Sequence, residues 1–227
     1  MADSLKLDRI AFYGRTLAEY VRMYDLDLLA LRGKKVLDCP GGAASFTAEA
    51  LEHGIETFAC DIIYGGDMEA VLAQGEADIA HTVERVEEVA HLFVWDFYRD
   101  ANGLRASRTN ALRGFGRHYP HPRYINAMLP TLPFGDQAFD LVLSGHLLFT
   151  YSDRLDYAFH LQALREMYRV CADEVRVYPI QGLDAKPYPQ LPQLIADLQT
   201  VGINAEIAPV PFEFQRGSNE MLRLQRR

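Results

Sequence analysis

Three stretches of this sequence predict an α/β fold with a mostly parallel sheet and an antiparallel carboxyl-terminal hairpin. The first is Lys35–Ser45, a short apolar run that ends on a carboxylate and is followed by a proline and two glycines. The second is an apolar run that ends on Asp61, at the interval expected of a Rossmann-like nucleoside site. The third is a pair of strand-like segments, 203–214 and 220–225, joined by a turn-forming sequence.

The turn after the first strand predicts a nucleoside ligand other than a dinucleotide. Residues Pro40–Ser45 lack the G-x-G-x-x-G fingerprint, and Asp38 lies just before the turn, where it would repel a pyrophosphate. An ammonium or sulfonium group is compatible with that carboxylate. Gly41 and Gly42 let a ligand approach the backbone, and Asp61 is placed to accept hydrogen bonds from ribose hydroxyls. The alternative for Asp61 is a structural turn or helix-capping role.

Two segments resemble class I methyltransferases that use S-adenosylmethionine (SAM). Val36–Ala44 is similar to their first motif, D-x-G-x-G-x-G, although Pro40 and Ala44 stand where the family prefers glycine. Leu132–Val142 resembles the L-P-F-x-D-x-x-F-D-x-V segment of the branch that includes quinone-biosynthesis C-methyltransferases. In order and spacing the resemblance covers roughly residues 34–227, as one domain of this length allows.

The resemblance implies SAM as the cofactor and a set of residues that hold it. Asp38 and Asp61 close the first two strands, and Ser144 closes the fourth. Met128 and Leu129 would meet the adenine through backbone groups, and Met128 stands where many members place an acid. The implied set is Asp38, Pro40, Gly41, Gly42, Asp61, Met128, Leu129 and Ser144.

Length and composition are those of one ordinary globular domain. The chain has 227 residues, of which 49% are hydrophobic and 24% are charged. A net charge of −8 argues against general binding to nucleic acid or to an anionic membrane. No apolar run reaches spanning length and no signal-peptide pattern is present, so the expected location is the cytoplasm. The three cysteines are not spaced as metal ligands and are expected to be free thiols.

Residues 1–33 are expected to form a helical preface before the first strand. Thr16–Glu19 has the form of a capping box, and apolar residues follow at helical spacing. In methyltransferases of this class such a preface often folds over the cofactor, which would place Tyr13, Arg15 or Tyr20 near the cofactor carboxylate. The interpretation we favour is that the tyrosines pack on the sheet while Arg15 is solvated.

The remaining pattern alternates strands with helices. Each helix is indicated by apolar residues at helical spacing, and each strand by a short apolar run or by alternation. The fourth strand is nearly continuous in apolar residues, as a strand buried on both faces should be. The expected helices are 46–53, 76–92, 104–119, 155–171 and 189–201, and the expected strands are 35–38, 55–60, 123–127, 139–144, 174–179, 203–214 and 220–225.

Residues 66–122 form a connection far longer than a parallel sheet requires. We expect a helical insertion here, and because connections of this size usually carry function we interpret it as a substrate lid. It contains the only tryptophan, Trp95, in the densest aromatic stretch, and Arg108, which interrupts an apolar helical stripe. Trp95, Arg108 and Tyr151, which follows the fourth strand, are the expected substrate contacts.

Arg108 needs a partner if its helix buries that stripe, because an unpaired guanidinium is costly away from water. The partner is either a carboxylate of the protein or an anionic substrate. Several arginines surround Arg108 in the sequence, and Asp100 is the only acid among them. We therefore favour an anionic group on the substrate.

His146 is the best candidate for a general base, because it follows the fourth strand at the edge of the sheet where the reaction must take place. The alternative is a histidine that caps the next helix or lines the cofactor pocket. Tyr151 and Asp96 are weaker candidates. Alignment of the nucleophile with the methyl group supplies much of the rate, so a base is needed only where the nucleophile must lose a proton.

The sequence thus predicts SAM-dependent methyl transfer to a small molecule, anionic if Arg108 binds it. Two other functions stay open. One is a SAM- or nucleoside-binding protein without transferase activity, which the altered glycine turn and Met128 favour. The other is a nicotinamide-dependent oxidoreductase, which the missing G-x-G-x-x-G and the antiparallel hairpin disfavour.

Overall fold

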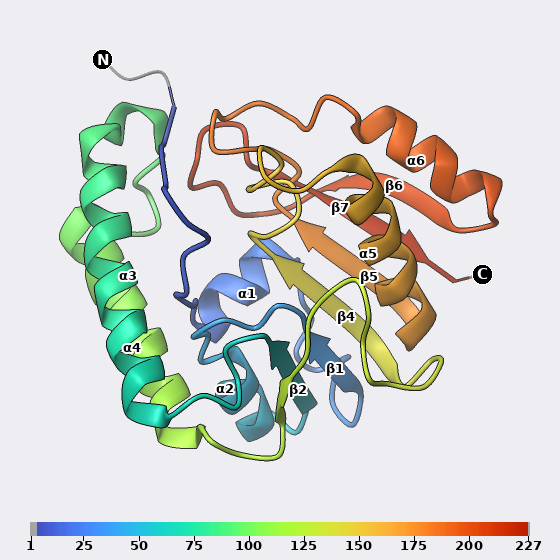
Figure 1. The fold of residues 1–227 in the computed structure, drawn as a ribbon, viewed down its shortest axis with the longest axis horizontal. Coiled ribbons are helices and arrows are strands. Elements are labelled where there is room, and N and C mark those ends of the chain that lie inside the picture. Colours follow the sequence, from blue (N-terminus) through green and yellow to red (C-terminus); the bar gives the residue numbers. More distant parts are fainter. Residues whose placement is uncertain (1–3, 227) are drawn as a thin grey trace.

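The computed structural model describes residues 4–226, and its centre is a seven-stranded sheet (Figure 1). The strand order is β3-β2-β1-β4-β5-β7-β6. The first five strands are parallel, whereas β7 runs antiparallel to both of its neighbours. The mostly parallel sheet with an antiparallel carboxyl-terminal hairpin is therefore confirmed. The strands are β1 Lys35–Asp38, β2 Glu56–Asp61, β3 Tyr124–Asn126, β4 Phe139–Gly145, β5 Cys171–Tyr178, β6 Asn204–Pro209 and β7 Glu220–Gln225.

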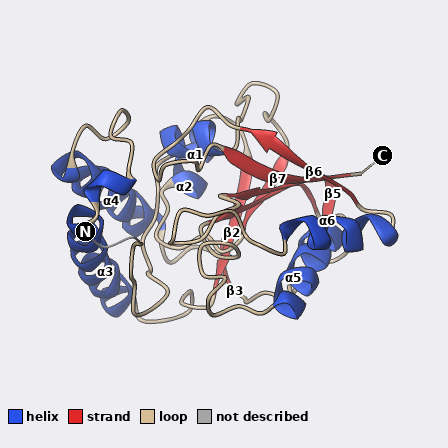
Figure 2. Ribbon diagram, turned by 90° about the horizontal axis from the view of Figure 1, so that it is seen from above, coloured by secondary structure: helices blue, strands red, loops and turns tan. Residues whose placement is uncertain are grey.

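Helices cover both faces of the sheet. Helices α1 and α2 lie on one face and α5 and α6 on the other, and the long pair α3 and α4 stands beside the first layer (Figure 2). A short 3₁₀ turn, η1, follows α3. The bounds are α1 Leu17–Met23, α2 Phe46–Glu52, α3 Met68–Glu88, η1 Ala90–Leu92, α4 Ala101–His118, α5 Tyr157–Val170 and α6 Leu191–Thr200.

Each face of the sheet buries its own apolar cluster. The cluster under α1 to α4 also takes in apolar residues of the amino-terminal residues 4–16, and it contains the stacked rings of Tyr20 and Phe46, whose centroids are 4.3 Å apart. The cluster under α5 and α6 includes Leu164 and Leu194, neither of which is exposed. The central strands are covered on both sides, as their apolar sequence predicts.

The insertion contains two antiparallel helices, but α3 begins eight residues before the predicted start at Glu76. Asp67 caps it by accepting a hydrogen bond from the Ala70 N–H at 3.1 Å. Position 75 of α3 has no room for a larger side chain, because a Cβ there would be 2.7 Å from a methyl carbon of Leu112 on α4. The close approach of the two helices therefore explains a glycine that helix propensity alone disfavours.

The predicted helical preface is wrong for most of its length. Residues 1–3 lie outside the described residues. Between residues 4 and 33 only the seven residues of α1 are helical, and residues 4–16 before them are irregular or extended. We call residues 4–16 the amino-terminal segment. Glu19 accepts a hydrogen bond from the backbone N–H of Thr16 at 2.9 Å, so the capping box is confirmed. At the other end of the chain β6 stops at Pro209, short of the predicted 214, because Pro209 and Pro211 interrupt the pattern.

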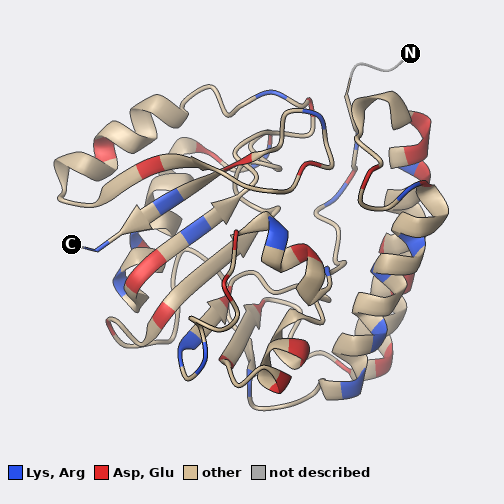
Figure 3. Cartoon of the chain, turned by 180° about the vertical axis from the view of Figure 1, so that it is seen from behind, with Lys and Arg blue, Asp and Glu red and all other residues tan. Residues whose placement is uncertain are grey.

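Charged residues of both signs are spread over the molecule (Figure 3), but α3 carries mostly acids and the charged residues of α4 are all arginines. On the sheet, Glu174 accepts hydrogen bonds from Arg176 and from Arg223 on the neighbouring strand. None of the described helices combines the length and the apolar character needed to cross a membrane.

Candidate active site

A cavity of about 520 Å³ lies across the carboxyl ends of the parallel strands. Its lining comes from the turn after β1, the end of β2, the loops after β3, β4 and β5, and the amino-terminal segment. The strand order shows where the two ends of the cavity lie. One end is beside β2 and β3 and the other is beside β5 and β7, and the turn after β1 and the loop after β4 lie between them.

Asp61 and the glycine turn are joined at the first end of the cavity. The Gly42 N–H donates to one carboxylate oxygen of Asp61 at 3.1 Å, and the Ile63 N–H donates to the other at 3.1 Å. Tyr64 donates its hydroxyl to the Gly42 carbonyl at 2.6 Å. Burial raises the pKa of Asp61, and its oxygens retain lone pairs toward the cavity that they line. Asp61 therefore has the structural contacts of a turn residue and also faces the ligand space.

Asp38 lies behind the cavity wall. It is fully buried and does not line the cavity, whereas Tyr20, which does, donates its hydroxyl to Asp38 at 2.8 Å. The other carboxylate oxygen has no partner. Burial raises the pKa of Asp38 to about 8, and the nearby charge of Asp61 adds to the rise. The expected direct contact between Asp38 and the cofactor is thus corrected to a supporting position under the turn.

Arg15 is a buried cation whose guanidinium lies over the ring of Tyr13, 5.4 Å from its centroid, and has no ion pair among the described residues. Its side chain lines the cavity, the residue is only 8% exposed, and no residue of the described chain forms a salt bridge or a hydrogen bond with its guanidinium. Its backbone carbonyl accepts a hydrogen bond from the Ser45 N–H at 3.1 Å, which places it over the turn after β1. The expectation of a solvated Arg15 is wrong. An unpaired buried guanidinium indicates a site for an anionic group of a ligand.

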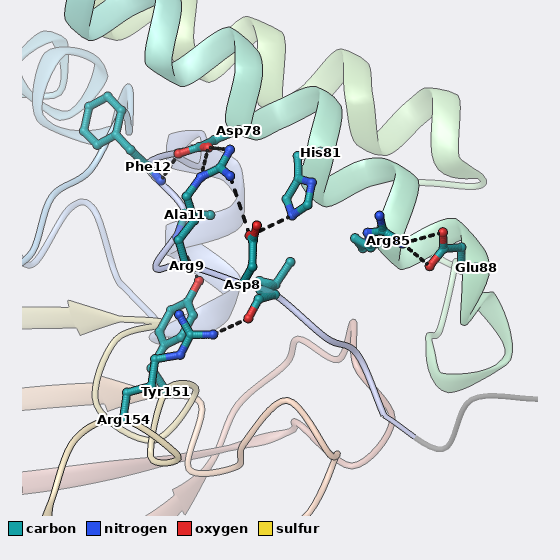
Figure 4. Close-up of polar contacts among 11 residues, drawn as sticks. Asp8, Arg9, Ala11, Phe12, Asp78, His81, Arg85, Glu88, Tyr151 and Arg154 are labelled. Atoms are coloured by element: carbon teal, nitrogen blue, oxygen red, sulfur yellow. Dashed lines mark hydrogen bonds and ion pairs between the residues drawn. The ribbon is translucent and has the colours of Figure 1, made fainter.

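The amino-terminal segment forms one wall of the cavity and is tied to elements on both sides (Figure 4). Asp78 of α3 accepts hydrogen bonds from the Phe12 N–H at 2.7 Å and from the Arg9 guanidinium at 2.6 Å. On the opposite side, Tyr151 accepts from the Ala11 N–H at 3.1 Å, and Arg154 donates to the carbonyl of Leu7. The segment therefore connects the helical insertion to the loop after β4.

The same segment packs directly on the glycine turn. A Cβ at Gly14 would lie 2.0 Å from the backbone of Ala43, so only glycine permits this contact. Asp78, which anchors the segment, was missed by sequence reasoning. The available signal was its position on the apolar stripe of α3, where it is 1% exposed, the same kind of signal that drew attention to Arg108.

Arg108 is buried as the stripe predicts, but its partner is a carboxylate of the protein. Its guanidinium forms an ion pair with Glu19 of α1, and both side chains are almost fully buried. Tyr98 and Ser107 donate hydroxyls to the same carboxylate. The favoured assignment of Arg108 to an anionic substrate is corrected, and the alternative that the sequence left open is the one observed. Arg108 does not line the cavity.

His146 lies at the middle of the cavity, where the sequence placed it. Its backbone N–H donates to the Tyr178 carbonyl at 2.8 Å, and its Nδ1 is buried without a partner. Burial lowers the pKa of His146 well below 6.5, and the positive charges of Arg15 and Arg108 lower it further. The imidazole is therefore neutral at physiological pH, and its unpartnered ring nitrogen faces no hydrogen-bonding group of the described chain.

The other predicted residues divide between the cavity and its surroundings. Pro40, Gly41, Met128, Leu129 and Tyr151 line it, and Tyr151 is buried, which raises the pKa of its hydroxyl to about 12. Trp95 does not line it, because its indole donates to the Ala90 carbonyl at 3.1 Å and its ring packs behind Phe93 and Phe214. Ser144 is buried outside the lining, and Asp96 is exposed away from it. Within residues 4–226, no cluster of three or more His, Cys, Asp or Glu could hold a metal ion.

Comparison with known families gives a match to part of the chain. Residues 100–178, from the start of α4 to the end of β5, match the family model described as a methyltransferase domain. This match agrees with the sheet arrangement that the resemblance to class I SAM-dependent methyltransferases implies. The model describes the domain in general, so the quinone-biosynthesis branch is not confirmed.

Individual relatives span nearly the whole chain. An uncharacterized protein of Methanocaldococcus jannaschii is 28% identical over 227 residues, which cover 98% of this chain and 99% of the relative. A solved SAM-dependent methyltransferase from Aquifex aeolicus is 14% identical, with 91% of this chain and 92% of that one covered and a TM-score of 0.42. The 1,6-didemethyltoxoflavin-N1-methyltransferase of Burkholderia thailandensis is also 14% identical, with 88% and 76% covered and a TM-score of 0.46.

Proposed function

We propose that this protein transfers the methyl group of SAM to a small molecule bound in the same cavity. The observation that carries the proposal is the order of groups along the cavity. Arg15 lies over the glycine turn, Asp61 follows at the end of β2, and Met128 and Leu129 lie beyond β3. That order fits a ligand with a carboxylate at one end, a ribose in the middle and a purine at the other end.

Each of these groups has a feature that suits one part of SAM. Arg15 offers an unpaired guanidinium to the carboxylate, which a planar fork binds with two hydrogen bonds. Asp61 offers free lone pairs to the ribose hydroxyls. Met128 is 61% exposed on the cavity rim, so its side chain can cover an adenine ring while backbone groups meet the ring edge.

The chain's part in the reaction is alignment and, for a protic nucleophile, proton removal. SAM supplies a methyl group activated by its bond to a sulfonium, and the sulfur becomes a neutral thioether when it loses that group. The cavity holds the acceptor in line with that methyl group and keeps water out. His146, neutral and unpartnered at Nδ1, takes the proton that the acceptor loses.

The acceptor is a small molecule because the amino-terminal segment closes one side of the cavity. The basis for an anionic acceptor, a free Arg108, is removed by the ion pair of Arg108 with Glu19. Arg15 remains the one lining residue with a permanent positive charge in the described chain, and the cofactor carboxylate accounts for it.

Calorimetric titration with two ligands tests the cofactor assignment. S-Adenosylhomocysteine carries the amino-acid carboxylate, whereas 5′-methylthioadenosine has the same nucleoside without it. Arg15→Met should weaken S-adenosylhomocysteine by roughly 10- to 100-fold and leave 5′-methylthioadenosine unchanged, and Asp61→Asn should weaken both. Arg113→Met, on the exposed face of α4, serves as the control and should change neither.

Two outcomes would contradict the assignment. If Arg15→Met weakened both ligands equally, Arg15 would not contact the carboxylate. If neither ligand bound the wild-type protein, the proposed function itself would be wrong. A separate assay measures activity as transfer of labelled methyl groups from SAM.

A further inference from the structure

We infer that the methyl acceptor is an uncharged, largely apolar molecule with one hydroxyl or amine, bound at the end of the cavity beside β5 and β7. This inference rests on the proposed function, because it concerns the second ligand of the same cavity. It replaces the anionic acceptor that the sequence favoured. Its support is the chemistry of the residues that line this end.

Apolar side chains from four separate parts of the chain form this end, which we call the acceptor chamber. The Leu5 N–H donates to the Leu183 carbonyl at 3.1 Å, so the amino-terminal segment is tied to the loop after β5. The rings of Phe93 and Phe214 lie 4.6 Å apart between centroids and join the insertion to the loop before β7. The chamber consists of Leu5, Leu7, Val86, Phe93, Leu183 and Phe214, all of which line the cavity. Gln215 and Ser218 also line the cavity before β7, but their side chains are hydrogen-bonded within the protein.

The chamber lies on the opposite side of the sheet centre from the nucleoside end. Asp61 closes β2, whereas Leu183 follows β5 and Phe214 precedes β7, and β1 and β4 stand between these positions. His146, in the loop after β4, is therefore between the two ends. A methyl group presented from the nucleoside end would meet the acceptor near His146.

No charged side chain lines the chamber among the described residues. The lining residues with formal charges are Arg15, Asp61 and Asp78. Asp61 lies at the nucleoside end, Arg15 lies over the turn after β1 and is assigned to the cofactor carboxylate, and Asp78 is already bonded to Arg9 and to the Phe12 N–H. A charged acceptor would have to lose its hydration here without gaining a counter-ion, which is strongly unfavourable.

Two buried polar atoms at the edge of the chamber predict the acceptor's polar group. The Nδ1 of His146 and the hydroxyl oxygen of Thr150 both lack a hydrogen-bond partner, and both residues line the cavity. A hydroxyl or amine can donate to the imidazole and accept from Thr150. In the transfer step its lone pair forms the bond to the methyl carbon, the carbon–sulfur bonding pair moves to sulfur, and its proton moves to His146.

A matched pair of fluorescent probes tests the inference on the full chain saturated with S-adenosylhomocysteine. At pH 7.5, 2-naphthol is neutral and 2-naphthoate is an anion of the same ring system. We expect 2-naphthol to bind at least about 10-fold more tightly. Leu183→Lys, at a half-buried chamber position, should reverse the preference, whereas Ile207→Lys on the exposed face of β6 should leave it unchanged.

Thr150→Val tests the polar contact, since it removes the hydroxyl and keeps the side-chain shape. It should weaken 2-naphthol by roughly 3- to 10-fold and leave naphthalene, which has no hydroxyl, unchanged. Equal or tighter binding of 2-naphthoate, or failure of 2-naphthol to bind, would overturn the inference. Titration with S-adenosylhomocysteine alone keeps these results distinct from failure of the proposed function.

Discussion

His146 shows how strongly surroundings set the chemistry of a single residue. Burial of its imidazole lowers its pKa well below 6.5, and the positive charges of Arg15 and Arg108 lower it further. The rate of methyl transfer should therefore show no inflection from His146 between pH 6 and 8. His146→Ala should lower kcat by roughly 10²–10⁴ without changing the affinity for S-adenosylhomocysteine.

The pH profile of kcat and a titration of the variant check this prediction. A wild-type rate that rises with a midpoint near pH 6.5, and loses that midpoint in His146→Ala, would show that the imidazole is charged at lower pH. A fall in cofactor affinity equal to the fall in rate would instead place His146 in the cofactor pocket.

The pKa of Asp38 leads to a prediction about the stability of the fold rather than the reaction rate. Its pKa is raised to about 8 in the folded protein, above the ordinary value of an unfolded aspartate. Stability is therefore greatest below about pH 4, where Asp38 is protonated in both states, and it declines from there to about pH 8, where the buried carboxyl also ionises. Asp38→Asn resembles the protonated acid, so it should melt higher than the wild type at pH 8.5 and higher by a much smaller margin at pH 5.

Thermal melts of both proteins without ligand, from pH 5 to 9, measure this difference. Parallel curves for the wild type and Asp38→Asn would mean that Asp38 is ionised in the folded state throughout. Asp136→Asn, at an exposed position, is the control for a general change in net charge.

Helices α1 and α4 are joined by the buried pair of Glu19 and Arg108. Arg108→Met leaves the Glu19 carboxylate buried without its cation, so the free energy of unfolding should fall by about 3 kcal/mol or more. Arg105→Met, one turn away and exposed, should change it by less than about 0.5 kcal/mol. The double variant Glu19→Gln/Arg108→Met should lose less than the sum of the single changes.

Urea unfolding monitored by fluorescence measures these differences. The Arg108 pair and hydrogen bonds hold the pKa of Glu19 at about 2 despite its burial, so its contribution is present above pH 4.5 and is lost as the pH falls toward 2. A nearly normal stability of Arg108→Met would contradict the structural role and return Arg108 to the candidate ligand contacts.

The amino-terminal segment depends on one buried carboxylate for its position against α3. Asp78→Ala removes the acceptor of the Phe12 N–H and of Arg9. Because the segment packs on the glycine turn, its release should speed dissociation of S-adenosylhomocysteine by about 10-fold or more. Asp8→Ala, whose carboxylate is exposed and pairs with His81 at the surface, should have little effect.

Stopped-flow displacement measures both dissociation rates. An unchanged rate in Asp78→Ala, with the melting temperature lowered, would mean that Asp78 stabilises the fold but the segment does not control ligand release.

For the molecule as a whole, binding to the folded state should appear as thermal stabilisation. S-Adenosylhomocysteine at about 100 times its Kd should add about 2.7 kcal/mol, which raises the Tm by roughly 5–10 °C for a chain of this size. NAD and NADP should produce no shift, because the turn lacks the pyrophosphate fingerprint. A shift with NAD and none with S-adenosylhomocysteine would favour the oxidoreductase alternative.

The sequence by itself determined the order of the strands along the chain and the glycine turn after the first strand. It also determined that Asp61 ends the second strand and that His146 follows the fourth. These features depend on local patterns, apolar runs and turn residues, which short segments carry without reference to the rest of the chain. The start of α3 was missed because Gly75 disfavours a helix locally, and only its contact with Leu112 on α4 explains it.

Only the tertiary structure decided which charged groups are paired and which are left for a ligand. The sequence indicated burial for Arg108 and solvation for Arg15, yet both are buried. Glu19, 89 residues away from Arg108 along the chain, forms an ion pair with Arg108, whereas the described chain gives the Arg15 guanidinium no ion pair. Pairing between distant segments depends on how the amino-terminal segment, α1 and α4 pack together, and that packing is a property of the folded chain rather than of any local pattern.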